Sequence, residues 1–198
     1  MTSSPENMIR HTFKPEGLPV WYAWVVANYH DFDNSQHSYV GNLINAIKYP
    51  KGIVQPEMVQ QLRTVVKHSI LQIQGFTKST RQFSRLDAVV AVPNNPPKEF
   101  SVPHLMADEV ATTLGIPNRS PEVTKVTKTA QAKFGSELNP DVYKAKGSLQ
   151  GQIVLLVDDV LGSGNTLESV ATNLRKAGAK GVVGFCLAKT KVGMTSGN

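Results

Sequence analysis

The fold of this chain is decided by residues 152–167, which read Gln-Ile-Val-Leu-Leu-Val-Asp-Asp-Val-Leu-Gly-Ser-Gly-Asn-Thr-Leu. The run 153–157 is apolar and too short for a helix, so it predicts a buried parallel strand. Asp158 and Asp159 stand at the carboxyl end of that strand. A loop of small and hydroxyl residues follows and opens into an amphipathic helix. Because ligands of open parallel sheets bind outside the carboxyl ends of the strands, this turn is the candidate functional site.

Each part of the stretch suits one part of a phosphorylated sugar. Backbone N–H groups of a glycine-containing loop close around a phosphate, hydroxyl side chains add donors, and a helix N-terminus contributes partial positive charge. Two carboxylates repel a phosphate but accept hydrogen bonds from vicinal hydroxyls, which a ribose ring offers. Strand, acid pair and loop together predict a ribose 5-phosphate cradle. Its predicted phosphate ligands are Gly162, Ser163, Gly164, Asn165 and Thr166.

The stretch 153–167 resembles the phosphoribosyl pyrophosphate (PRPP) signature of the type I phosphoribosyltransferases, in which an apolar strand, two acidic residues and a Thr/Gly-rich loop follow one another. The resemblance implies that Asp158 and Asp159 are catalytic and hold the ribose, and that Val160 and Leu161 belong to the PRPP site. Gly162 departs from the pattern, because Thr is usual there and its hydroxyl donor is missing. The alternative is a switch-point loop of another α/β protein with a solvated acid pair. The nucleotide P-loop is excluded, because no Gly-Lys-Ser/Thr follows the glycines.

Length and composition favour a globular domain with a sizeable core. The chain has 198 residues, of which 40% are hydrophobic and 18% charged. Its N-terminal segment is polar and gives no sign of a secretory signal, and the apolar run 20–27 is too short to span a bilayer. The single cysteine, Cys186, lies in an apolar run and is expected to be a buried thiol. We therefore expect a cytoplasmic protein with no membrane partner.

The net charge of +6 suits two kinds of partner. One is a substrate with several phosphate charges, and the other is nucleic acid. Basic residues are spread along the chain, and the densest group lies between Lys125 and Lys146 without interleaved aromatic residues. Either a solvated loop or a contact with substrate accounts for that group.

Apolar periodicity alternates between strands and helices along the chain. Strands are predicted at 20–29, 86–92, 153–157 and 182–187, and helices at 38–49, 56–74, 104–114 and 166–177. This alternation predicts an α/β fold, a doubly wound parallel sheet of the type I phosphoribosyltransferase kind with a small N-terminal hood. The polar segment 76–85 is interpreted as a linker. The predicted division is an N-terminal hood with helices over 1–80 and a phosphoribosyltransferase core over 81–198.

A second strand end of interest follows Val92, where a Pro-rich loop begins. In the type I phosphoribosyltransferases the corresponding loop binds the pyrophosphate through backbone N–H groups and a basic residue. The resemblance implies that Lys98 is the catalytic cation here and that Asn94 and Asn95 are further PRPP ligands. The alternative is a rigid turn with a solvated lysine.

Other segments resemble the ComF-like, amidophosphoribosyltransferase-related branch of this family. A helix from Tyr39 ends in Lys48-Tyr49 before the first core strand, as in that branch. The element Lys98-Glu99-Phe100-Ser101 matches a basic-Gly-Phe-Asn element in part, and 127–131 echoes a Thr-x-x-Gln element with altered spacing. With one cysteine, this sequence does not contain the four-cysteine zinc ribbon with which many such proteins begin.

The resemblance implies transfer of a phosphoribosyl group in nucleotide metabolism. A nitrogen nucleophile, either a free base or ammonia, displaces pyrophosphate from the anomeric carbon of PRPP. Mg²⁺ is the expected cofactor, carried by PRPP near Asp158 and Asp159 with no direct protein ligands. The histidines lack ligand spacing, so no metal site made of protein ligands is expected. No residue is predicted as the general base, and the identity of the acceptor cannot be read from the sequence.

Two other functions stay open from the sequence. A non-catalytic regulator would bind PRPP in the cradle without converting it, and the missing hydroxyl at Gly162 favours this function. An accessory protein of DNA uptake or defence would use the basic charge to bind nucleic acid. Type I relatives commonly pair, and Trp21 and Trp24 supply apolar surface, so a homodimer is expected.

Overall fold

The computed structural model describes residues 9–11, 20–30, 36–80, 85–94, 100–126 and 142–190. Its elements in chain order are β1 (Ile9–His11), β2 (Val20–Asn28), α1 (Tyr39–Lys48), α2 (Pro56–Thr80), β3 (Ala88–Ala91), α3 (Val102–Leu114), the 3-10 helix η2 (Ser120–Glu122), β4 (Val123–Lys125), β5 (Tyr143–Ala145), β6 (Ile153–Leu161), α4 (Asn165–Lys176) and β7 (Gly181–Lys189). Among the helices described, none combines the length and apolar character that a membrane span requires.

Five strands form the main sheet, in the order β1-β2-β7-β6-β3. The four strands from β2 to β3 are parallel neighbours, so that Val154 of β6 lies opposite Val182 on one side and Ala88 on the other. β1 is an antiparallel edge strand, which pairs Ile9 with Val25. The polar N-terminal segment did not predict this strand. The predicted α/β class with a parallel central sheet is confirmed.

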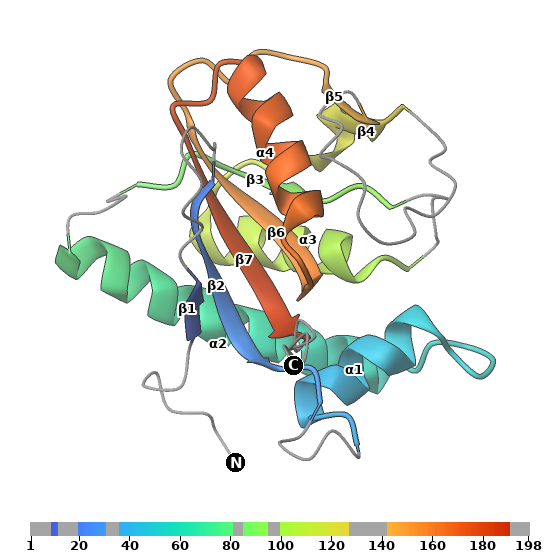
Figure 1. Cartoon of the computed structure of the whole chain (residues 1–198). Coiled ribbons are helices and arrows are strands. Elements are labelled where there is room, and N and C mark those ends of the chain that lie inside the picture. The colour runs from blue at the N-terminus through green and yellow to red at the C-terminus, as the bar shows by residue number, and fades with distance from the viewer. Residues whose placement is uncertain are drawn as a thin grey trace, which may run out of the picture.

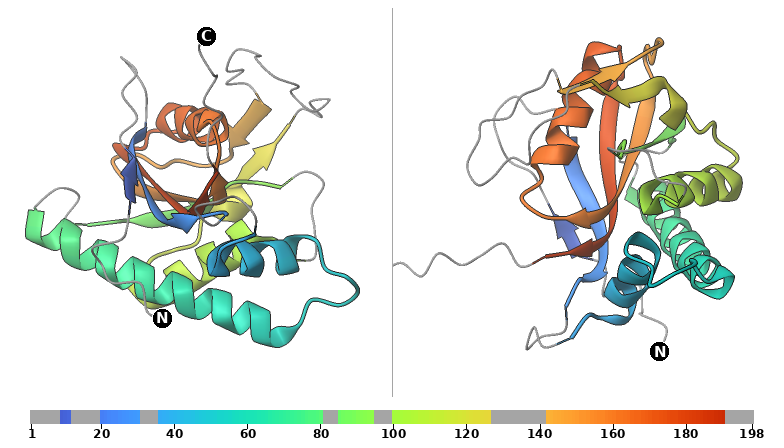
Figure 2. Two further views of the ribbon diagram at one scale, coloured as in Figure 1. Left: turned by 60° about the horizontal axis from the view of Figure 1, so that its bottom comes forward. Right: turned by 90° about the vertical axis from the view of Figure 1, so that its right-hand side faces the viewer.

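Helices cover both faces of the sheet (Figures 1 and 2). α1, α2 and α3 lie on one face, where Ile44 and Met106 join the same buried cluster as Phe185 of β7. α4 lies on the other face, where Val170 joins the same buried cluster as Leu156 of β6. These side chains are fully buried, and each contributes about 1.5–3 kcal/mol to folding. The two clusters fix the position of β6 between α1 and α4.

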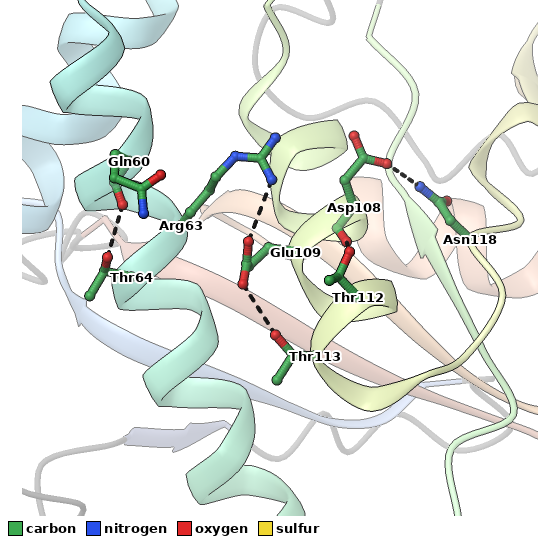
Figure 3. A network of polar contacts seen from close by, with 8 residues as sticks. All are labelled: Gln60, Arg63, Thr64, Asp108, Glu109, Thr112, Thr113 and Asn118. Atoms are coloured by element: carbon green, nitrogen blue, oxygen red, sulfur yellow. Dashed lines mark hydrogen bonds and ion pairs between the residues drawn. The ribbon is translucent and has the colours of Figure 1, made fainter.

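A polar network ties α2 to α3 and α3 to the segment after it (Figure 3). Arg63 of α2 pairs with Glu109 of α3 at 3.4 Å, and Glu109 also accepts a hydrogen bond from Thr113 at 3.2 Å. Asp108 accepts a hydrogen bond from Asn118 at 2.8 Å, where Asn118 forms a bridge with β3. These contacts hold the helical layer to the sheet at a distance from the acid pair.

Several element boundaries differ from the prediction, among them those of α2, α3 and β6. α2 continues to Thr80, into the predicted linker, because the polar run after residue 74 contains no proline to stop it. α3 begins at Val102, since Pro103 occupies its first turn, where proline is tolerated. β6 continues to Leu161, because its backbone still pairs with β7 through Asp158 and beyond.

The predicted division at residue 80 remains a prediction. The sheet draws on both sides of that position, since β2 pairs with β7 and α1 packs in the same core as β6. Cys186 is fully buried in β7, as expected, and burial raises the pKa of its thiol well above the usual range.

Candidate functional site

The acid pair lies within β6 and not beyond its end. The pairing with β7 runs from Ile153 through Asp158 opposite Cys186 to Leu161 opposite Lys189. Successive side chains of a strand point to opposite faces of the sheet. Asp158 lines a pocket beside α4, whereas Asp159 meets Lys48 of α1 on the other face. The predicted pair is therefore divided between the two faces, which follows from the strand running through it.

A cavity of about 240 Å³ lies at the carboxyl end of β6 on the α4 side. Its lining joins one carboxylate to the predicted phosphate loop and to the residue that follows β7. The lining residues are Asp158, Val160, Leu161, Gly162, Ser163, Gly164, Thr166, Leu167 and Thr190. Of the predicted loop ligands, Asn165 alone is outside this lining, and it is exposed at the first position of α4. The structure thus brings Asp158 and the loop together.

The loop is shaped by Gly164, the N-cap residue immediately before α4. Gly164 is buried and has φ +91°, a conformation that side-chain-bearing residues rarely adopt. Its carbonyl accepts the N–H of Glu168 at 3.0 Å, which closes the first helical turn. No described residue accepts a hydrogen bond from the N–H groups of residues 162–164. Together with the partial positive charge of the α4 N-terminus, these donors suit an anion in the pocket.

Asp158 stands in an environment that disfavours its charge. Burial, together with the neighbouring charge of Asp159, raises the pKa of Asp158 to about 8. Two contacts act in the opposite direction, namely the N–H of Asp159, which donates to Asp158 Oδ1 at 2.9 Å, and the cation of Lys48. Tyr143 of β5 is also close, and burial together with the charge of Asp158 raises the pKa of that phenol. A carboxyl of this kind both accepts and donates hydrogen bonds near neutral pH.

Asp159 is paired with a lysine from another layer of the fold. Lys48 Nζ lies 2.7 Å from Asp159 Oδ2, and the side chains of Lys48 and Asp159 are 34% and 8% exposed. Burial lowers the pKa of Lys48, but the charge and hydrogen bond of Asp159 outweigh it and leave that pKa raised. The ammonium therefore stays charged at neutral pH. Tyr29, at the end of β2, lies near the same ion pair, and burial raises the pKa of its phenol.

The second predicted loop is described only at its two ends. Asn95 and Lys98 lie outside the described residues, as do residues 127–131. Asn94 Nδ2 donates to Ser101 Oγ, which lies 2.9 Å from Nδ1 of His104 in the first turn of α3. Burial lowers the pKa of His104, so the imidazole is neutral at neutral pH. This short polar chain joins the ends of the segment 94–101.

Within the part of the chain that the structure describes, no group of three or more His, Cys, Asp or Glu side chains gathers around a common point. The two carboxylates of β6 point to opposite faces, and one of them is held by Lys48. A cation near this site would take most of its oxygen ligands from a phosphorylated substrate and from water, as Mg²⁺ commonly does.

Residues 104–192 match the phosphoribosyl transferase domain, a span that runs from α3 past the end of β7. It contains β6, the phosphate loop, α4 and Thr190, so the pocket lies wholly inside the matched segment. The match agrees with the type I phosphoribosyltransferase fold that the signature stretch predicted. It leaves the narrower ComF-like resemblance a prediction.

Solved structures similar to the chain include the following three proteins. The chain is 16% identical to adenine phosphoribosyltransferase from Leishmania tarentolae, with 90% of this chain and 94% of that one covered and a TM-score of 0.47. It is 20% identical to purine phosphoribosyltransferase from Pyrococcus horikoshii, with 68% and 77% covered and a TM-score of 0.41. Glutamine PRPP amidotransferase from B. subtilis is 20% identical, with 65% of this chain but only 26% of that chain covered and a TM-score of 0.43. No curated protein sequence matches the chain.

Among the residues at the site that the sequence did not predict as site residues, Lys48 and Thr190 have polar side chains. Lys48 comes from a helix more than a hundred positions before Asp159, and only the Lys48-Tyr49 resemblance marked it. Thr190 lies just after β7 and carries no motif, although a strand paired with β6 had to end beside the loop. Both residues reach the site because β7 and α1 flank β6 in space.

Proposed function

We propose that this chain is a phosphoribosyltransferase that binds PRPP with Mg²⁺ and transfers the phosphoribosyl group to a nitrogen acceptor. The observation that carries the proposal is the pocket at the end of β6, where one carboxylate and a glycine-shaped loop at a helix N-terminus meet in about 240 Å³. That volume suits a ribose ring and one phosphate. The phosphoribosyl transferase domain match over 104–192 supports the same function.

The roles follow from the two faces of β6. The loop residues from Gly162 to Thr166 would hold the 5-phosphate. Asp158 would accept hydrogen bonds from the neighbouring ribose hydroxyls or donate one to them. Asp159 would reach a ribose hydroxyl only by sharing its second oxygen, because Oδ2 is engaged by Lys48. Asn94, Asn95 and Lys98 would meet the pyrophosphate at the end of β3.

The transfer itself asks for positioning and charge stabilisation. The bond between the anomeric carbon and the pyrophosphate oxygen breaks, the pyrophosphate leaves with the electron pair, and a new carbon–nitrogen bond forms. The proton that the acceptor nitrogen loses goes to solvent, since no described residue is assigned as the base. Mg²⁺ bound to PRPP would neutralise charge on the leaving pyrophosphate. A site of this kind works by holding both reactants in line and by stabilising the departing charge.

A screen of purine and pyrimidine bases, ammonia and simple amines with PRPP and Mg²⁺, followed as pyrophosphate release, tests the proposal. We expect the parent protein to release pyrophosphate with at least one acceptor. The Asp158→Asn variant should release it at least tenfold more slowly with the same acceptor. A control variant outside the pocket lining, Arg63→Met in the network between α2 and α3, should keep the parent rate. Absence of release with every acceptor, together with absence of PRPP binding, would contradict the proposal.

A second candidate, a PRPP-binding regulator without turnover, is favoured by one observation. Gly162 offers no side-chain hydroxyl to the phosphate, and it is exposed at the mouth of the pocket. This candidate predicts that PRPP binds while no acceptor releases pyrophosphate. Binding of single- or double-stranded DNA with a steep dependence on salt would support the further role in DNA uptake or defence.

Three narrower proposals accompany this function. The protein would act in the cytoplasm, in nucleotide metabolism. It would belong to the ComF-like branch, and the N-terminal part of its chain would form the hood. It would form a homodimer, and light scattering at micromolar protein concentrations tests this. A monomer mass at every concentration would contradict the homodimer and leave the proposed site unaffected.

A further inference from the structure

The phosphate loop lacks a hydroxyl at one position, and a hydroxyl from another strand stands next to that position. A Cβ placed on Gly162 would lie 3.9 Å from Oγ1 of Thr190, an ordinary van der Waals contact. The volume that a side chain at residue 162 would enter is therefore bordered by the hydroxyl of Thr190. Both residues line the cavity that contains Asp158.

The backbone places Thr190 firmly, while its hydroxyl keeps freedom to turn. Its N–H donates to the carbonyl of Leu161 at 3.1 Å, which continues the pairing of β7 with β6 by one residue. The Thr190 hydroxyl lies 3.5 Å from the same carbonyl, which is long for an O–H···O hydrogen bond. Such a weak contact is readily exchanged for a charged acceptor, because hydrogen bonds to charged groups are the stronger kind.

We infer that Thr190 is a ligand of the phosphate in this pocket, and that it supplies from β7 the hydroxyl donor that Gly162 lacks. This inference rests on the proposed function, because it takes the ligand of the pocket to be a sugar phosphate. It assigns to β7 a share in binding that the signature stretch in β6 and α4 does not reveal. It also accounts for a loop that binds phosphate despite its glycine at residue 162.

The experiment measures the affinity of ribose 5-phosphate by calorimetry for the parent and five variants. Thr190→Val removes the hydroxyl and keeps the shape, and Thr190→Ser keeps the hydroxyl. Gly162→Thr adds a hydroxyl at the loop, where φ is outside the left-handed range and the added Cβ has ordinary contacts. The double variant Gly162→Thr with Thr190→Val moves the hydroxyl from one strand end to the other. Thr172→Val on α4 is the matched control. The Thr172 hydroxyl donates to the carbonyl of Glu168 at 2.9 Å, and Thr172 is not among the residues that line the pocket.

We expect Thr190→Val to weaken ribose 5-phosphate binding about tenfold or more, since a hydrogen bond to a charged group is worth about 1.5–3 kcal/mol. Thr190→Ser and Thr172→Val should stay within about twofold of the parent, and the double variant should recover most of the loss. Free pyrophosphate should bind all the variants equally, because the proposed function assigns it to the loop after β3 and not to this pocket.

Three results would overturn the inference. If Thr190→Val bound ribose 5-phosphate as tightly as the parent, the Thr190 hydroxyl would take no part in binding. A loss of the same size in Thr190→Ser, or a double variant that stays as weak as Thr190→Val, would show that shape and not the hydroxyl matters. These results leave the proposed function intact, whereas a parent that bound neither ribose 5-phosphate nor PRPP would overturn both.

Discussion

The two faces of β6 treat neighbouring carboxylates in opposite ways. On the α4 face, Asp158 forms no ion pair with any residue that the structure describes and borders an open pocket, and its pKa is raised to about 8. On the α1 face, Asp159 is buried and bound to Lys48 at 2.7 Å. One carboxylate is available to a ligand, and the other is engaged by the fold. Adjacent acids in a motif therefore need not share one role, because a strand sends them to different layers.

The largest expected difference concerns sugar-phosphate binding by the two single variants. Asp158→Asn should weaken ribose 5-phosphate binding about tenfold to a hundredfold, because the amide cannot ionise, and a hydrogen bond to a charged acceptor is worth about 1.5–3 kcal/mol. Asp159→Asn should weaken it no more than about threefold. Calorimetry with both variants, and with pyrophosphate as the control ligand, checks this. Equal losses in the two variants would show that both acids reach the ribose and would end the division of roles.

The next effect is on stability and belongs to the α1 face. Lys48→Met leaves a buried carboxylate without its cation, so we expect the free energy of unfolding to fall by about 1–2 kcal/mol, a figure reduced for the partial exposure of Lys48. Urea unfolding monitored by circular dichroism measures the change. Arg85→Met is the matched control, since the Arg85–Asp87 pair at 2.9 Å has a guanidinium that is 85% exposed. It should change stability by less than about 0.5 kcal/mol, and a similar loss in both variants would contradict a special role for Lys48.

The sequence predicts most of the pocket because its parts are local. The apolar run, the glycine-containing loop and the helix that follows are all set by neighbours within about fifteen residues, and in the structure Gly164 of this loop adopts a positive φ. The fold class follows equally from the alternation of periods. For these features the physical cause and the motif lie in the same stretch of chain.

What the sequence does not predict depends on contacts between distant segments. The predicted end of the strand at Val157 is wrong, because pairing with β7 carries the strand through the acids, and no local signal marks that pairing. The partner of Asp159 could be known only from the packing of α1 on the sheet. Thr190 reaches the pocket for the same reason, through the register of β7. Partners that lie far apart in the sequence produce no motif of fixed residue spacing from which their contact could be predicted.

A smaller effect should appear in the pH dependence of stability. The pKa of Asp158 is raised in the folded chain, so the folded state holds a proton that the unfolded chain releases. Its contribution to stability is full below the unfolded pKa and is lost as pH rises through about 8. The groups facing it are Asp159 on β6, Tyr143 on β5, Cys186 on β7 and Lys48 on α1.

Asp158→Asn removes this titration and keeps an oxygen to accept the N–H of Asp159. We therefore expect the variant to gain stability relative to the parent between pH 5 and pH 9, as the parent carboxyl is forced to ionise. Urea midpoints of both proteins at the two pH values measure the gain. A parent and variant whose stabilities run parallel over this range would show that Asp158 has no raised pKa.

We propose that the pocket on the α4 face binds PRPP, and thermal unfolding with and without millimolar PRPP and MgCl₂ measures this binding. A ligand at a hundred times its dissociation constant adds about 2.7 kcal/mol to stability, which corresponds to a rise in Tm of about 5–10 °C for a chain of this length. We expect such a rise for the parent and for Thr172→Val, and a much smaller one for Asp158→Asn at the same PRPP concentration. An unchanged Tm for the parent, or an equal rise for Asp158→Asn, would contradict it.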